Sequence, residues 1–449
     1  MILLAWHGYC IVIIDIAVCW ATKPMCNLTV AHGLFLFLTV SFFTIGFTMN
    51  HKRIITTAAA TLLSLQPFVA TSAEDATSVS QMFTDGSAST SFRYRYEMVD
   101  QDGIDKDAGA STLKSRLTWK SSSYNGFTTG LEIDNVTVIG NESYKTPTNG
   151  MAGYPIVADP KGTDVNQAYL SYSTSSYKST VGRQRILHAG QRFVGGVGWR
   201  QNEQTYDALT VSLPDVNSVK IDYSYIWNVN RIFGPIDSAV QAKQWGSDSH
   251  ALLASFSPAK GHSLKAFAYL LDFDNAAANS TSTYGVDYKG KLGKVTLAAS
   301  VATQSDYADN PASFDTDYLM AELSMPVKAV TVALGYELLG GDEGVGFKTP
   351  LATLHKFQGW ADKFLGTPGT GLEDTYLKVA GKISGIPVVV FYHEFSADEG
   401  GADLGSELDI VGTYKINKNL SAQLKYASYS AETHATDTDK VWLTLNMKF

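Results

Sequence analysis

Apolar and polar residues alternate with a period of two along most of this chain. The last ten residues show the pattern clearly, with Val441, Leu443, Leu445, Met447 and Phe449 alternating with Trp442, Thr444, Asn446 and Lys448. Side chains alternate across a β-strand, so such a segment has one apolar and one polar face. A strand of this kind that closes a chain on an aromatic residue is typical of the final strand of a bacterial outer-membrane β-barrel.

The same alternation predicts about eighteen strands of roughly ten residues each. Their expected starts lie near Thr90, Ser111, Gly126, Asp164, Ser179, Gln204, Ser218, His250, Ser263, Thr281, Lys294, Asp317, Val330, Leu372, Ile386, Gly405, Leu420 and Lys440. The fold class is therefore all-β, a transmembrane antiparallel up-and-down barrel. Sixteen or twenty strands also satisfy the even number that the connections require.

Short and long connections alternate between these strands. The long ones are Gly140–Thr163, Ile186–Glu203, Asn228–Ser249 and Leu339–Gly371. Short periplasmic turns on one rim and long extracellular loops on the other are typical of bacterial barrels. Both termini are then expected on the periplasmic side. A soluble sandwich or propeller does not need this loop asymmetry together with this terminal strand.

The N-terminal region resembles a secretory signal that begins late. Met49–Arg53 is a short basic stretch, Ile54–Ala70 is largely apolar, and Thr71–Ala73 offers small residues for cleavage. We interpret Met49 as the true start, residues 1–48 as an over-extended reading frame, 49–73 as the signal peptide, 74–89 as a periplasmic segment and 90–449 as the barrel. The alternative for residues 1–48 is a helical anchor upstream of the signal.

Composition agrees with this compartment. All three cysteines precede residue 74, which suits an oxidising periplasm. A mean hydropathy of −0.04 is too polar for a helical membrane protein, while 45% apolar residues are too many for a disordered chain. The net charge of the whole chain is −8. Residues 1–73 have a net positive charge, so the rest of the chain is more acidic than this total. A nucleic-acid partner is therefore not expected.

In a barrel the polar members of each strand point into the lumen. The residues expected to line a pore are Arg93, Arg95, Lys114, Arg116, Lys120, Glu132, Asp134, Arg183 and Arg185. All eight arginines beyond residue 73 fall between Arg93 and Arg231, so they should gather on one wall. A row of guanidinium groups indicates a path for an anionic solute. The alternative is an unselective pore in which the arginines neutralise the inward carboxylates.

Two stretches carry a family resemblance. They are GRQRILHAGQRFVGGVGWRQNEQTYDA, residues 182–208, and TPLATLHKFQGWADKFL, residues 349–365, which is followed by GLEDTY at 371–376. Both resemble the alginate-export family of outer-membrane β-barrels. The resemblance implies an eighteen-stranded monomeric barrel with an arginine-lined pore for an anionic polyuronate.

The two stretches also hold the expected loop residues. The first covers a glycine-rich loop that we expect to bend into the pore and form a constriction, with Arg192, Trp199, Arg200 and Gln201 on it. A surface loop folded on itself is the alternative. The second has apolar residues at helical intervals and predicts a short amphipathic helix over the mouth. Its lid candidates are His355, Trp360 and Lys363.

The sequence thus predicts a porin in the outer membrane of a Gram-negative bacterium, passing small hydrophilic, anionic solutes such as acidic sugars or uronates. A dedicated exporter of an anionic polysaccharide such as alginate is the alternative, and an outer-membrane enzyme or adhesin is less favoured. Expected partners are membrane lipid and lipopolysaccharide, the solute, and the barrel assembly machinery through the strand ending in Phe449. The sequence shows no catalytic, metal or cofactor motif among its histidines and acidic residues.

Overall fold

The computed structural model describes residues 75–449. The predicted signal peptide, residues 49–73, and the segment before it lie outside the described residues. The described part begins with a short helix, α2 (Val79–Thr84), whose N-cap Ser78 accepts a hydrogen bond from the Gln81 amide. No helix within this part of the chain is long and apolar enough to cross a membrane.

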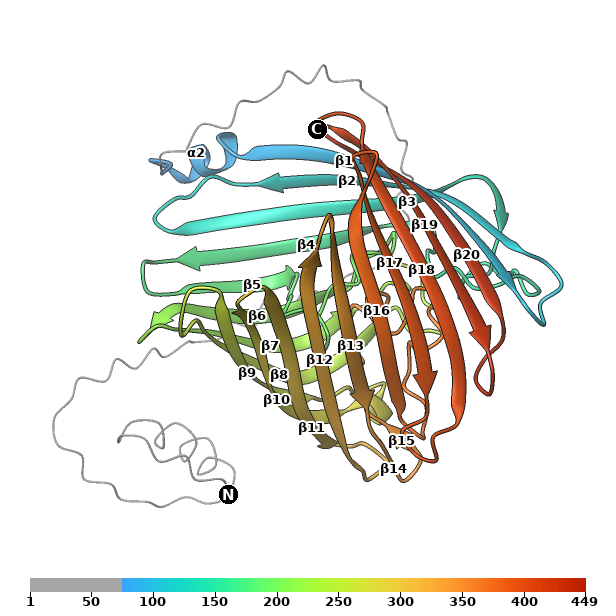
Figure 1. Ribbon diagram of the computed structural model, residues 1–449. Helices are drawn as coiled ribbons and strands as arrows, with labels where there is room; N and C mark the ends of the chain where they lie inside the picture. Colours follow the sequence, from blue (N-terminus) through green and yellow to red (C-terminus); the bar gives the residue numbers. More distant parts are fainter. Residues whose placement is uncertain (1–74) are drawn as a thin grey trace. The chain divides into compact units, whose positions relative to one another are not determined.

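Eighteen long strands form one closed antiparallel sheet (Figure 1). Each pairs with its neighbours in sequence, and β1 closes the ring by pairing with β20 from Ser91↔Lys448 to Gln101↔Thr438. The strands are β1 (Ser87–Gln101), β2 (Ala108–Lys120), β3 (Phe127–Ser143), β4 (Gly162–Ser173), β5 (Lys178–Gln184), β6 (Thr205–Val216), β7 (Val219–Asn230), β8 (Gln244–Phe256), β9 (His262–Leu271), β10 (Thr281–Leu292), β11 (Val295–Asp306), β12 (Asp315–Val327), β13 (Val330–Leu339), β16 (Leu372–Ile383), β17 (Ile386–Ser396), β18 (Asp403–Lys415), β19 (Leu420–Ala431) and β20 (Thr438–Lys448). Two-residue strands β14 (Gly341–Asp342) and β15 (Val345–Gly346) and a 3₁₀ turn, η1 (Ala277–Asn279), lie in connections.

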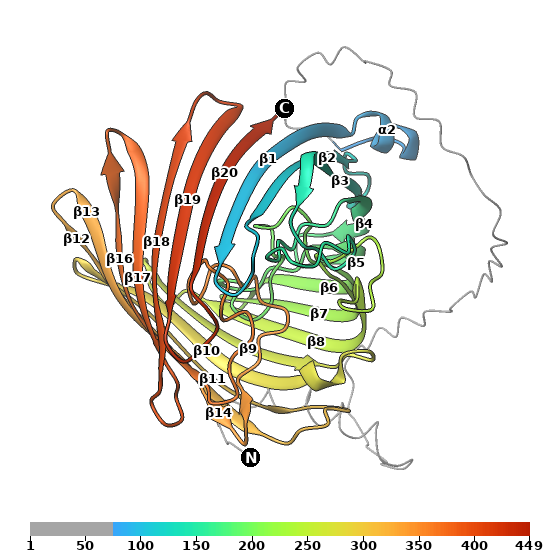
Figure 2. The ribbon, with the colours of Figure 1, turned by 90° about the vertical axis from the view of Figure 1, so that its right-hand side faces the viewer.

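The predicted barrel and its eighteen strands are confirmed. The first strand starts at Ser87 and not at Thr90, so the barrel begins slightly before the expected boundary. The connections 144–161, 185–204, 231–243 and 340–371 are the long ones, and all leave the same rim (Figure 2). We call this the long-loop rim and the opposite one the short-turn rim. Helix α2 and Phe449 both lie at the short-turn rim, where Phe449 exchanges backbone hydrogen bonds of 2.9 and 3.1 Å with Thr90.

Side chains alternate across the wall as a membrane barrel requires. On β1, Arg95 and Glu97 are buried, whereas Tyr96 and Met98 between and beside them are exposed. Large apolar side chains such as Leu334 and Leu424 are exposed on the outer face. The outside of the ring is therefore apolar and the inside polar, because each strand presents alternate residues to the two faces.

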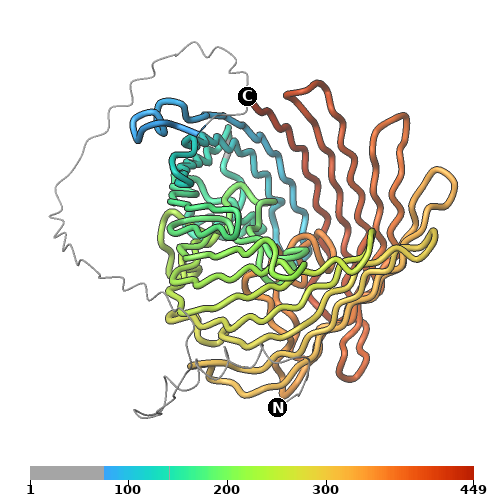
Figure 3. The backbone as a smooth tube through the Cα atoms, turned by 90° about the vertical axis from the view of Figure 1, so that its left-hand side faces the viewer, coloured from blue at the N-terminus to red at the C-terminus, as the bar shows by residue number. Residues whose placement is uncertain are grey.

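Two long loops fill part of the interior. Phe193 and Val194 of one loop and Leu351 and Phe364 of the other belong to a single buried cluster with wall residues such as Phe267. Figure 3 shows these connections within the ring of strands. The apolar side chains of the loops are thus shielded inside the barrel, and the loops narrow its lumen.

The amphipathic helix expected within residues 349–365 is absent from the structure. Leu354, Gln358 and Asp362 have φ values of 56°, 51° and 60°, and this left-handed conformation interrupts a right-handed helix. The segment is a chain of turns. Its helix-like spacing of apolar residues reflects burial of Leu351, Trp360 and Phe364 against different parts of the wall.

Candidate functional site

The loop of residues 185–204, here the constriction loop, and the loop of residues 347–371, here the lid loop, are bonded to each other. Val194 and Leu351 form a parallel bridge, and the Gly195 amide donates to the Leu351 carbonyl at 2.8 Å. The Thr353 amide returns a bond of 3.0 Å to the Gln191 carbonyl. A Cβ on Gly195 would lie 3.1 Å from the Thr353 nitrogen and 2.8 Å from Gln191 Cβ, so glycine permits this approach.

The lid loop is held on β18 by two buried carboxylates. Glu407 Oε1 accepts from the Ala361 amide at 2.6 Å, and Asp409 Oδ2 accepts from the Trp360 amide at 3.1 Å. Gly359 comes directly before Trp360 and Ala361 in the chain and has a φ of 78°. A Cβ on Gly359 would overlap the Glu407 side-chain carboxyl group. Both amides thus have buried acceptors on β18, and these hydrogen bonds fix the loop inside the barrel.

Arg192 of the constriction loop binds to side chains of β13 and of the lid loop. Its Nε lies 2.6 Å from Glu337 Oε1 on β13, and its Nη2 donates to Gln358 of the lid loop at 3.3 Å. Gln358 also bonds Glu337, which accepts from Tyr318 at 2.5 Å. Burial lowers the pKa of Arg192, but the contacts with Glu337 and Tyr318 together outweigh burial and the pKa is raised.

Arg200 reaches the other side of the lumen. Its guanidinium lies 3.0 Å from Glu97 on β1 and 3.0 Å from Asp362 of the lid loop. The Gln201 side chain donates from Nε2 to Thr112 Oγ1 at 2.9 Å, and the Gln201 backbone N–H donates to Asp159 Oδ1 at 2.8 Å. Contacts with β1, β2, β13 and the lid loop place the constriction loop across the pore, away from the outer surface.

An aromatic and basic cluster lies beside Arg200. Trp199 stacks on His355 with centroids 4.1 Å apart, and the Arg95 guanidinium lies 4.0 Å above the Trp199 ring. His355 bonds Asp362 at 2.8 Å and Lys425 at 2.6 Å. Burial holds the pKa of His355 well below its usual value, although Asp362 opposes the shift. Burial would raise the pKa of Asp362, but His355 and Lys440 outweigh it and the pKa is lowered. The ring is therefore neutral and the carboxylate ionised at neutral pH.

The predicted basic wall exists, but carboxylates pair with most of it. Arg116 makes two bonds of 2.6 Å to Asp134 and lies 3.2 Å from Glu203. Arg185 contacts Glu132 and lies 2.5 Å from Glu203, while Lys114 lies 3.2 Å from Asp134. These contacts place Glu132 and Asp134 inside the barrel. Glu203 lies in the constriction loop and was not among the expected residues.

Arg93 differs from its neighbours on this wall. It donates to the carbonyls of Gly198, Trp199 and Arg200 at 3.1–3.2 Å and to Asn446 at 3.2 Å. Among residues 75–449 it has no carboxylate partner within 4.0 Å. Lys120, at the end of β2, is exposed. Lys363 of the lid loop has its Nζ 6.0 Å from the centre of the Tyr429 ring.

Arg183 is not on the inner face, contrary to the prediction. It shares its face of β5 with exposed Val181, whereas Thr180 and Gln184 between them are buried. It pairs with Asp207 at 2.8 Å and lies 3.6 Å from Asp164. The strand ends at Gln184, so Arg185 leaves the alternation and turns inward. The prediction that both arginines face inward is therefore wrong for Arg183, because the alternation ends before Arg185.

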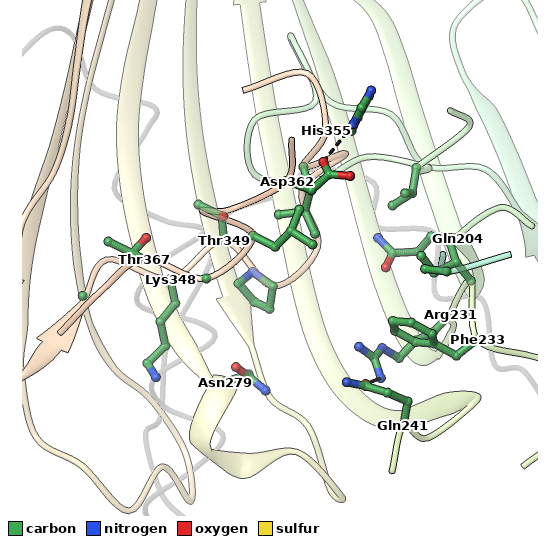
Figure 4. Close-up of a pocket in the computed structure, with 18 of the residues that line it drawn as sticks. Gln204, Arg231, Phe233, Gln241, Asn279, Lys348, Thr349, His355, Asp362 and Thr367 are labelled. Carbon is green, nitrogen blue, oxygen red and sulfur yellow. Dashed lines mark hydrogen bonds and ion pairs between the residues drawn. The ribbon is translucent and has the colours of Figure 1, made fainter. Parts of the chain in front are cut away.

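Two cavities lie on either side of the joined loops. The outer cavity, about 620 Å³, opens toward the long-loop rim and is lined by Arg200, Arg231, Lys348, His355 and Asp362 (Figure 4). The inner cavity, about 560 Å³, lies toward the short-turn rim. Its lining includes Arg192, Gln358, Trp360, Lys265, Lys289, Lys378, Asp287, Glu322 and His393. The two loops therefore separate two chambers, each lined by charged as well as apolar side chains.

The outer cavity carries two cations that the sequence analysis did not assign to a site. Arg231 donates to Gln241 and the Ala242 carbonyl, both at 3.1 Å, and lies 4.0 Å above the Trp245 ring. Burial lowers its pKa to about 10, so it remains charged at neutral pH. Within the described residues neither Arg231 nor Lys348 has a carboxylate within 4.0 Å. The only available signal was that Arg231 ends the arginine-rich half of the chain. No cluster in residues 75–449 has the residues to hold a metal ion.

Comparisons with known proteins agree on the fold. No family model matches the chain, and no curated protein matches it, so the resemblance to the alginate-export family has no support. Solved structures do match. Acinetobacter baumannii OccAB4 has a TM-score of 0.64 at 14% identity, covering 81% of this chain and 98% of its own. Pseudomonas aeruginosa OccK8 (OprE) has a TM-score of 0.64 at 14% identity, covering 82% and 99%. Pseudomonas aeruginosa OpdK, solved with vanillate, has a TM-score of 0.62 at 13% identity, covering 81% and 98%. The chain has the fold of these outer-membrane porins.

Proposed function

We propose that the protein is an integral outer-membrane porin through which small hydrophilic solutes diffuse passively, with a preference for anions. The observation that carries the proposal is a closed barrel whose joined loops separate two cavities of about 620 and 560 Å³, both of which are lined in part by charged side chains. An apolar outer face and a polar interior suit a membrane channel. Both described ends of the chain lie at the short-turn rim, which would face the periplasm.

The anion preference rests on a small set of cations. Salt bridges largely neutralise the wall of Lys114, Arg116 and Arg185, so that wall alone would not select by charge. Arg231 and Lys348 in the outer cavity and Arg93 beside the constriction remain without carboxylate partners among the described residues. A positive potential at these points would raise the local concentration of anions.

Export of a long polysaccharide is the less favoured alternative. A polymer would need both loops to leave the lumen at once, yet they are bonded to each other and to β1, β13 and β18. A small solute needs only limited movement of side chains. Lipopolysaccharide contacts and recognition of the strand ending in Phe449 by the assembly machinery stay predictions, as does the choice of solute among acidic sugars and uronates.

Swelling of proteoliposomes tests the proposal. Purified protein in phospholipid vesicles would be mixed with isosmotic glucose, glucuronate or vanillate, the last because OpdK was solved with it. We expect swelling with all three, faster for the two carboxylates. Folded and inserted protein that gives no swelling with any solute would refute the channel. Equal rates for glucose and glucuronate would refute only the anion preference.

A further inference from the structure

A groove on the outside of the barrel lies between α2 and the wall at the short-turn rim. It measures about 450 Å³ and is lined by Val79, Met82, Phe83, Trp119, Phe127 and Leu170, with Tyr124 and Thr129 at its edge. Helix α2 and strands β2, β3 and β4 contribute these residues. The groove is unrelated to the two internal cavities.

The wall side of the groove belongs to the outer face. Trp119 shares the outward register of Leu117 on β2 and pairs with Leu131 on β3. Leu117, Leu131, Phe127 and Leu170 are each exposed by two-fifths or more. The groove therefore continues the apolar band that would contact acyl chains in a membrane.

The helix side is fixed in place but leaves apolar side chains uncovered. The Ser122 amide donates to the Met82 carbonyl at 3.0 Å, and the Ala76 amide donates to the Ser123 carbonyl at 2.7 Å. Phe83 stacks on Trp119 with centroids 5.7 Å apart and rings inclined by 11°. Val79 and Phe83 nevertheless remain 57% and 51% exposed. A six-residue helix with two such side chains beside a lipid-facing wall is arranged to contact an apolar partner.

We propose that this groove binds one acyl chain of a phospholipid from the membrane leaflet at the short-turn rim. The inference rests on the proposed membrane location, and it adds a specific lipid contact that anchors the start of the barrel. An acyl chain fits because the lining is mainly methyl, methylene and aromatic surface, and its side-chain polar atoms are only the Tyr124 and Thr129 hydroxyls and the Trp119 indole nitrogen. An acyl chain that lies along Leu131 and Leu170 on the outer face can continue into the groove and stay in contact with apolar side chains over its whole length.

Photolabelling with a phospholipid that carries a diazirine in its acyl chain tests this proposal. The full chain would be inserted into vesicles of phosphatidylethanolamine and phosphatidylglycerol that contain the probe, illuminated, and digested for mass spectrometry. Leu334 on β13, 59% exposed on the outer face, reports ordinary lipid contact. We expect the peptides with α2 and Trp119 to be labelled severalfold more than the Leu334 peptide. The double variant V79A/F83A should reduce Trp119 labelling to the Leu334 level, and L334A should leave it unchanged.

Each contrary outcome has a separate meaning. Trp119 labelling equal to that of Leu334 and unaffected by V79A/F83A would overturn the groove site, leaving unspecific boundary lipid only. A Trp119 region that is unlabelled but chemically cross-linked to residues 1–74 would also overturn it, because a segment of this chain would occupy the groove. A Leu334 peptide without any label would instead show that the protein does not insert, which contradicts the proposed function itself.

Discussion

Gly359→Ala should release the lid loop and change the pore. Gly359 has φ 78°, and an added Cβ would overlap the Glu407 carboxylate. The left-handed conformation costs alanine about 1–2 kcal/mol. Displacing the carboxylate also weakens the bonds that the Trp360 and Ala361 amides donate to Asp409 and Glu407.

The size of the effect follows from these contacts. A buried hydrogen bond contributes about 0.5–1.5 kcal/mol net. Losing both bonds and adding the backbone strain therefore disfavours the docked loop by about 3 kcal/mol, roughly a hundredfold change in its equilibrium. The barrel strands do not depend on this contact. We expect a folded, heat-modifiable barrel with a larger or more strongly fluctuating single-channel conductance.

Gly366→Ala is the matched control for this experiment. Gly366 lies in the same loop, has no positive φ, and a Cβ there would meet no atom within 4 Å. Gly366 lines the outer cavity, so its added methyl group should lower the current only slightly, without the larger or more strongly fluctuating conductance expected of Gly359→Ala. If Gly359→Ala gave the same conductance and noise as Gly366→Ala, the lid loop would not restrict the pore and the reasoning would be wrong.

Three further predictions concern charge. Arg231→Gln should shift the zero-current potential toward cations in a salt gradient, since it removes an unpaired charge from the outer cavity; an unchanged potential would exclude Arg231 from selectivity. Arg192→Ala and Arg200→Ala should change conductance or selectivity, and unchanged currents in both would place the constriction loop outside the pathway. Burial lowers the pKa of His188 to about 4, so the unfolded state binds more protons between pH 6.5 and 4. Stability should be full above pH 6.5 and fall by roughly 3 kcal/mol toward pH 4, a loss that His188→Leu should remove in urea titrations of the protein in micelles.

Strand positions could be predicted because each strand has an apolar outer face and a polar inner face. These two faces impose a period of two on every wall segment, and the period can be recognised without knowledge of any partner. The expected starts at Thr281, Val330, Leu372, Ile386 and Leu420 agree with the structure. Loop lengths follow from strand positions, so the two rims could be distinguished as well.

The site was only partly predictable because it depends on contacts between distant segments. Arg116 belongs to the inward series, but its partner Glu203 comes from a loop 87 positions later that the sequence does not place. Arg183 and Arg185 have the same spacing as an inward pair, yet β5 ends between them. The apolar spacing in the lid loop resembles a helix because turns can place residues against a curved wall at similar intervals. The local sequence pattern is enough to predict the strands of the wall. The arrangement of side chains in the lumen depends on how distant segments pack together.

The central claim is that this barrel is a channel narrowed by its two joined loops, and single-channel recording tests it most directly. Full-length protein in a planar bilayer under a salt gradient should give discrete current steps. The zero-current potential should have the sign expected for a channel that conducts anions better than cations. Folded, inserted protein that produces no discrete current would contradict the account.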